Sequence, residues 1–154
     1  MPHIEENGQT MKSVLILCTG NSCRSQMAEG LWNHLGDGEW RAHSAGSNPT
    51  GYVHDLAKVA MEKIGVDIDH ARSKHLKEFV DRPLDLIVSV CDNAKDSCSA
   101  LPHARETLHW PFDDPADAAG DDSQKLKYFE RVRDEIAKSI KEFLTSRRSG
   151  PASE

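Results

Sequence analysis

The chain has 154 residues and a formal net charge of −6, which leaves no general basic surface for nucleic acid or an anionic membrane. This length fits one ordinary domain with a full hydrophobic core, and no apolar run approaches the length of a transmembrane helix. The polar, acidic N-terminus is unlike a signal peptide, so we expect a cytoplasmic protein with neither a nucleic-acid nor a membrane partner. In a reducing compartment, the four cysteines are expected to be catalytic, redox-active or metal-bound rather than structural disulfides.

Both ends of the chain lack a regular apolar pattern. We expect residues 1–12 to form a flexible extension, residues 13–146 to form the domain, and residues 147–154 to form a frayed tail.

The first predicted unit is a strand, a loop and a helix. Residues 14–17 form a continuous apolar run, as in a parallel strand that is buried on both faces. From about Ser22, apolar residues recur at helical spacing until Gly36, which closes the pattern. The intervening loop lies at the carboxyl end of a strand and the amino end of a helix, where backbone N–H groups and the helix dipole attract anions.

That loop reads Cys18-Thr19-Gly20-Asn21-Ser22-Cys23-Arg24-Ser25. We expect its N–H groups to surround a tetrahedral oxyanion, with Gly20 allowing close approach and Arg24 completing the ring through a bidentate contact. A helix N-terminus and a cation both lower the pKa of a thiol, so Cys18 is expected to ionise easily and to act as a nucleophile. The alternative for a cysteine here is a small buried hydrophobic residue, and we favour that alternative for Cys23.

The later elements alternate between strands and helices. We expect strands at residues 39–45, 85–90 and 107–110, and helices at residues 53–64, 74–80 and 123–143. This alternation favours an α/β fold with a doubly wound parallel sheet, in which ligands bind outside the carboxyl ends of the strands.

Two further cysteines follow the strand at residues 85–90. Cys91 ends that strand and Cys98 stands seven residues later, with a polar stretch between them that predicts only a marginal helix. This spacing is poor for a zinc site, and the histidines show no ligand pattern, so we expect no metal.

The stretch Trp110-Pro111-Phe112-Asp113-Asp114-Pro115 follows the last predicted strand. It places a carboxylate on a proline-stiffened loop at the edge of the sheet where Cys18 lies, and such a loop can supply a general acid. The alternative is an Asx turn or a helix cap near Pro115.

The pattern Cys-x-x-x-x-x-Arg-Ser after an N-terminal strand resembles the low-molecular-weight tyrosine phosphatase superfamily. Residues 18–30 resemble, more narrowly, the thioredoxin-coupled arsenate reductases, and the likeness runs from about Ser13 to about Leu144. The resemblance implies a single-domain four-stranded parallel sheet in the order 2-1-3-4, with helices on both faces. Cys18 and Cys91 would then end adjacent strands ~4.8 Å apart, which brings them within reach of a disulfide.

The resemblance also implies an activity, the reduction of arsenate to arsenite. Cys18 would attack the oxyanion, Cys91 and Cys98 would be the second and third thiols of a relay, and an external thioredoxin would regenerate it without a bound cofactor. The oxyanion-binding residues would be Thr19, Gly20, Asn21, Ser22, Cys23, Arg24 and Ser25. The general acid of the family directly precedes the proline, which selects Asp114 and leaves Asp113 second. We expect a monomer.

Two other functions remain open. A low-molecular-weight protein tyrosine phosphatase would use Cys18, Arg24 and Asp114 but would give Cys91 and Cys98 no role. Phosphatases usually carry an aromatic residue after the proline, where this chain has alanine, so we expect at most weak residual phosphatase activity. A non-catalytic thiol redox switch, the third reading, would have no use for a general acid.

The resemblance extends to residues that support the loop. It implies that Asn21 holds the loop through side-chain hydrogen bonds and that Ser25 donates to the Cys18 thiolate. Some of these reductases hold potassium behind the loop, and Asn21, Glu29 and Ser44 match such positions. Lys74, however, falls where an aspartate ligand is expected. Because an ammonium group could replace the ion, we predict no tightly bound potassium.

Overall fold

The computed structural model describes residues 3–4, 10–36, 38–91, 101 and 104–149. Its strands are β1 (His3–Ile4), β2 (Thr10–Cys18), β3 (Trp40–Gly46), β4 (Leu86–Ser89) and β5 (Thr107–His109). Its α-helices are α1 (Arg24–Leu35), α2 (Asp55–Glu62) and α4 (Asp122–Ser149), and its 3₁₀ helices are η1 (Leu76–Phe79) and η3 (Pro115–Asp117).

The sheet is built around β2. Its parallel strands lie in the order β3-β2-β4-β5, which confirms the predicted 2-1-3-4 order when the strands are counted from β2. The strand β2 pairs with β3 on one side and with β4 on the other, and residues 14–17 have no exposed surface. Burial of both faces of this central strand explains why the run is continuously apolar rather than alternating.

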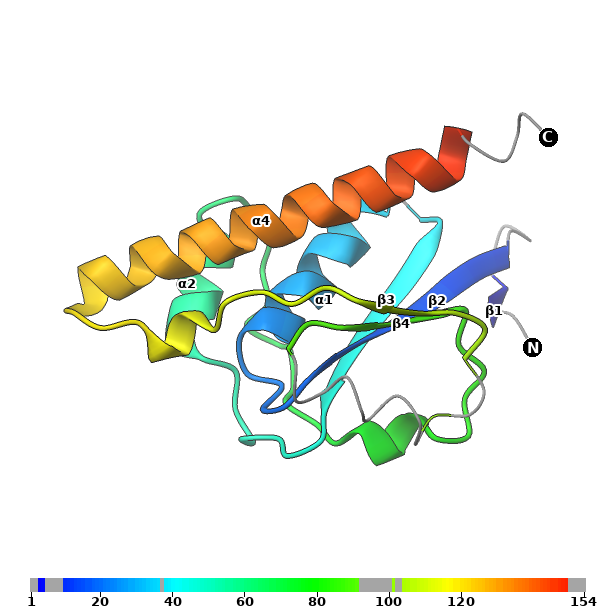
Figure 1. Ribbon diagram of the computed structural model, residues 1–154, viewed down its shortest axis with the longest axis horizontal. Coiled ribbons are helices and arrows are strands. Elements are labelled where there is room, and N and C mark those ends of the chain that lie inside the picture. Colours follow the sequence, from blue (N-terminus) through cyan, green and yellow to red (C-terminus); the bar gives the residue numbers. More distant parts are fainter. Residues whose placement is uncertain (1–2, 5–9, 37, 92–100, 102–103, 150–154) are drawn as a thin grey trace.

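Helices lie on both faces of the sheet, as predicted. Figure 1 shows α4 crossing over α1 and α2 on one side of the strands, and η1 lying on the opposite side. The helices α1 and α4 bury side chains spaced three or four residues apart, among them Met27, Leu31, Val132 and Ile136. The segment predicted as a helix at residues 74–80 is only the single 3₁₀ turn η1.

Some residues of both predicted ends lie in regular secondary structure. The strand β1 pairs antiparallel with Thr10 and Met11, so residues 3–4 and 10–12 of the predicted extension lie in strands. At the other end, α4 continues to Ser149. Two contacts of Arg147 stabilise this last part of the helix. Its guanidinium pairs with Glu106 and lies 4.4 Å from the centre of the Phe143 ring.

An aromatic cluster positions the segment that leaves β5. Trp110 stacks on Trp32 of α1 with ring centres 5.8 Å apart, and Phe143 of α4 packs against both rings. These contacts with α1 and α4 anchor the start of the segment that carries Asp113 and Asp114.

No helix in the described ranges is both long enough and apolar enough to cross a bilayer.

Candidate active site

The loop between Cys18 and Arg24 joins the carboxyl end of β2 to the first residue of α1. Three of its carbonyl groups accept hydrogen bonds from residues 48–54, at 2.9 to 3.0 Å: Thr19 from Asn48, Gly20 from Thr50 and Ser22 from His54. These three hydrogen bonds hold the loop against the neighbouring segment.

Asn21 supports the turn in the middle of the loop. Its φ of 48° is in the left-handed region, and its side chain is fully buried. The amide nitrogen donates to the hydroxyls of Ser25 (2.8 Å) and Ser44 (2.9 Å), while the amide oxygen accepts from the backbone N–H of Lys74 at 2.9 Å. These are the loop-holding hydrogen bonds expected of Asn21.

Gln26 is a supporting residue that sequence reasoning missed. Its fully buried amide lies within hydrogen-bonding distance, 3.0 to 3.2 Å, of both oxygens of Asn21 and of the carbonyl of Arg72. The signal was present, because a glutamine on the apolar face of a helix is rarely buried without a specific partner.

Gly46 lets the end of β3 lie directly against the loop. It pairs with Cys18 in the sheet, and a Cβ atom at this position would overlap the carbonyl oxygen of Thr19. We therefore expect Gly46→Ala to destabilise the protein by roughly 1–3 kcal/mol, as overpacking usually does. Thermal denaturation measures this effect.

Gly20→Ala is the matched control for that variant. A Cβ atom at Gly20 would meet side-chain atoms alone: the methyl group of Thr50 at 3.2 Å, which can move aside, and the Cβ atom of Ser22 at an ordinary 4.0 Å. Equal losses of thermal stability for the two variants would contradict the assigned role of Gly46.

Cys18 and Cys91 lie side by side at the carboxyl ends of the neighbouring strands β2 and β4. The N–H of Val90 donates to the carbonyl of Leu17 at 2.9 Å, which keeps β2 and β4 in register up to the two cysteines. The Cys91 side chain makes a hydrogen bond with the Cys18 thiol, and its sulfur lies 3.3 Å from the hydroxyl oxygen of Thr19. Both cysteines are buried and reduced.

The expectation of an easily ionised Cys18 is wrong for this state of the protein. The hydrogen bond with Cys91 and then burial raise the pKa of Cys18, whereas Arg24 and the N–H of Asn21 act in the opposite direction. The reason is that the hydrogen bond with Cys91 and the removal of the sulfur from water both favour the neutral thiol of Cys18 over its thiolate.

Cys23 is buried in the position that precedes α1. Burial raises its pKa to about 12, and the hydroxyl of Ser22 opposes this shift only in part. Because the Cys23 side chain packs within the hydrophobic core, the geometry agrees with the packed role that we favoured for it.

Arg24 connects the oxyanion loop to the segment after β5. Its Nη1 donates to the carbonyl of Phe112 at 3.0 Å, and its Nη2 lies 3.3 Å from a carboxylate oxygen of Asp114. Its Nε atom is buried and has no hydrogen-bond partner in the described part of the chain. A bound oxyanion would satisfy this donor.

The two neighbouring aspartates point to different partners. One carboxylate oxygen of Asp114 caps η3 by accepting from the N–H of Ala116 at 3.0 Å, and the other faces Arg24. Asp113 is largely exposed and pairs with Arg131 of α4 at 3.1 Å. Asp114 therefore acts as a cap, the alternative reading of this stretch, and it is also the carboxylate that reaches the loop.

Several predicted features are not tested by this geometry. Cys98 and the marginal helix predicted after Cys91 lie outside the described residues. The oxyanion contacts of residues 19–25 and the hydrogen bond from Ser25 to Cys18 stay predictions. Over the described ranges, no three His, Cys, Asp or Glu side chains gather as metal ligands.

Comparison with known proteins agrees with the resemblance inferred from the sequence. The family described as low molecular weight phosphotyrosine protein phosphatase matches residues 13–149. An arsenate reductase of Halalkalibacterium halodurans is 49% identical over 134 residues, which cover 86% of this chain and 94% of the relative. An arsenate reductase of Bacillus subtilis is 45% identical over the same length and with the same coverage.

A solved structure gives the same result. An arsenate reductase in the phosphate binding state superposes with a TM-score of 0.75 at 30% identity, covering 88% of this chain and 98% of the other. The chain therefore belongs to the low molecular weight phosphotyrosine protein phosphatase family, and within that family it groups with the arsenate reductases.

Proposed function

We propose that this protein reduces arsenate to arsenite through a thiol relay that begins at Cys18. The observation that carries the proposal is that Cys18 and Cys91 lie at the carboxyl ends of the paired strands β2 and β4, where the Cys91 side chain lies within hydrogen-bonding reach of the Cys18 thiol. Hydrolysis of a phosphate ester needs only the first thiol, whereas a two-electron reduction needs a second thiol to form a disulfide. The arsenate reductases among the relatives support the same substrate.

The first step forms a bond between sulfur and arsenic. The loop N–H groups and Arg24 hold the arsenate, and the Cys18 sulfur displaces a hydroxyl group from it. Asp114 donates a proton to that hydroxyl, and over the whole step the thiol proton and the hydroxyl leave as one water. When the oxyanion replaces Asp114 as the partner of Arg24, the carboxyl becomes free to carry this proton.

The second step is the reduction itself. The Cys91 sulfur attacks the Cys18 sulfur, a disulfide forms, and the electron pair of the sulfur–arsenic bond leaves with arsenic as arsenite, which takes up the Cys91 proton. Since the two cysteines lie at the carboxyl ends of adjacent paired strands, with their side chains in hydrogen-bonding reach, this step needs little movement of β2 or β4.

The third step regenerates Cys18. The Cys98 thiol attacks the Cys91 sulfur, which returns a thiol to Cys18 and leaves a disulfide between Cys91 and Cys98. A thioredoxin dithiol then reduces this disulfide and completes the cycle. The overall reaction consumes arsenate and one dithiol, and it yields arsenite, water and one disulfide.

One assay separates this function from its alternatives. We would measure arsenate-dependent NADPH consumption with thioredoxin and thioredoxin reductase, beside hydrolysis of phosphotyrosine by the same preparation. We expect rapid NADPH consumption and at most slow hydrolysis. Hydrolysis without NADPH consumption would instead identify a phosphatase, and the absence of both reactions would favour a non-catalytic redox switch.

A further inference from the structure

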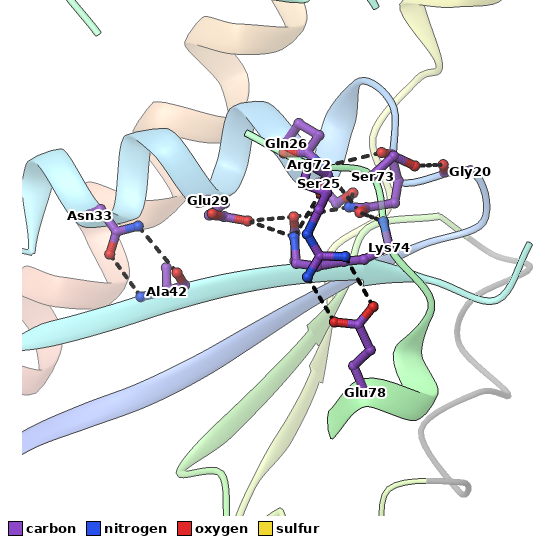
Figure 2. A network of polar contacts seen from close by, with 12 residues as sticks. Gly20, Ser25, Gln26, Glu29, Asn33, Ala42, Arg72, Ser73, Lys74 and Glu78 are labelled. Atoms are coloured by element: carbon purple, nitrogen blue, oxygen red, sulfur yellow. Dashed lines mark hydrogen bonds and ion pairs between the residues drawn. The ribbon is translucent and has the colours of Figure 1, made fainter. Parts of the chain in front are cut away.

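A partly buried ion pair lies behind the oxyanion loop. The ammonium of Lys74 is 3.7 Å from a carboxylate oxygen of Glu29, and the two side chains are only 11% and 22% exposed. Figure 2 shows the pair between α1 and β3, with Lys74 directed toward Glu29. The same ammonium donates to the carbonyl of Arg72 at 2.9 Å.

A chain of hydrogen bonds connects this ion pair to the loop. The Ser44 hydroxyl donates to Glu29 at 2.6 Å and accepts from the side-chain amide of Asn21 at 2.9 Å. The backbone N–H of Lys74 donates to the oxygen of the same amide at 2.9 Å. Lys74 therefore contacts the left-handed turn at Asn21 directly through its backbone and indirectly through Glu29.

The charge of Glu29 opposes the function of the loop. A carboxylate behind a site that binds oxyanions repels them, and its partial burial leaves this repulsion only partly screened by solvent. Among the described residues, Lys74 is the ion-pair partner of Glu29. The nearby guanidinium of Arg72 pairs instead with the exposed Glu78, at 2.8 and 3.1 Å (Figure 2).

We propose that Lys74 is a positioning residue for oxyanion binding, whose ammonium serves as a built-in counter-ion for Glu29. It neutralises the carboxylate behind the loop and keeps the hydrogen bonds that hold Asn21 in place. The protein then needs no external monovalent cation at this position. This inference rests on the oxyanion site of the proposed function, but it does not depend on the reduction steps.

The test measures the binding of inorganic phosphate to the full-length reduced protein by titration calorimetry. The buffer cation is tetramethylammonium, which is too large to enter the position of the Lys74 ammonium. We expect Lys74→Met to weaken phosphate binding about 10-fold, on the scale of coupling between neighbouring charged groups. Potassium chloride should restore most of this loss. Lys77→Met is the matched control, because it removes an exposed lysine nearby.

A second variant separates charge from packing. If Lys74 acts by neutralising Glu29, the double variant Lys74→Met, Glu29→Gln should bind phosphate more tightly than Lys74→Met alone, and potassium should no longer affect it. The glutamine keeps an oxygen that can accept from Ser44, so the hydrogen-bond chain survives. Lys74→Gln replaces Lys74→Met in this comparison if circular dichroism shows that the methionine variant is unfolded.

The outcomes distinguish this inference from the proposed function. Phosphate binding by Lys74→Met that equals the Lys77→Met control would overturn the role of Lys74 and leave the oxyanion site intact. A loss that neither potassium nor Glu29→Gln reverses would also overturn it, because packing alone would then explain the effect. Failure of the unmodified protein to bind phosphate would remove the oxyanion site, and the proposed function with it.

Discussion

Replacing Cys18 with serine is expected to abolish arsenate reduction and any hydrolysis of phosphate esters. Both reactions start with attack by the Cys18 sulfur, and a serine hydroxyl is a far weaker nucleophile that cannot form a disulfide with Cys91. The coupled NADPH assay and phosphotyrosine hydrolysis measure the two losses. Retention of either activity in Cys18→Ser would show that another group carries out the first step.

Cys91→Ser is the companion variant, because it separates the two reactions. We expect it to lose repeated thioredoxin-coupled turnover while phosphotyrosine hydrolysis continues, since that hydrolysis ends at Cys18. Arsenate should convert this variant to a species that is stalled before disulfide formation, which mass spectrometry of the quenched protein can detect. Sustained turnover at the rate of the unmodified protein would rule out the relay.

Asp114→Asn is expected to slow the first chemical step by ~10²- to 10⁴-fold, the usual contribution of a general acid. An asparagine cannot donate the proton that the leaving hydroxyl needs. It can still accept from the N–H of Ala116, so the cap of η3 and the fold should be preserved. Single-turnover kinetics, followed by rapid quenching, measure this step directly.

Asp113→Asn is the control for that experiment. Asp113 has the same chemistry and is adjacent in the chain, but its carboxylate pairs with Arg131 on the exposed side of α4. We expect its removal to change the rate of the first step by much less. If Asp113→Asn proves the slower variant, the general acid must be reassigned to Asp113.

The acidity of Cys18 shows how a local pattern can mislead. The strand, the helix N-terminus and Arg24 are visible in the sequence, and each of them predicts a lowered pKa. The opposing influences are the contact with Cys91 and the burial of the sulfur, which exist only once β2 and β4 are paired. The pKa prediction failed because the larger influences are tertiary.

The bounds of the helices and strands show a similar limit of prediction from the sequence. The predicted helix at residues 74–80 shrinks to η1, since the backbone of Lys74 is instead bonded to Asn21 and Gly46. The sequence does not reveal such bonds, because their partners are distant in the chain. Likewise, β2 begins at Thr10 because β1 provides a partner for its first residues.

The sequence by itself determined the order of strands and helices, the strand–loop–helix unit that begins at Cys18, and the family. Apolar periodicity, glycine positions and the Cys–Arg motif are local features, which can be recognised in the sequence without knowledge of the folded structure. Only the tertiary structure decided that Asp114 rather than Asp113 faces Arg24, that Cys91 lies beside Cys18, and that Lys74 pairs with Glu29. Each of these depends on how distant segments pack around the sheet, and packing is a property of the folded chain that no single stretch of sequence contains.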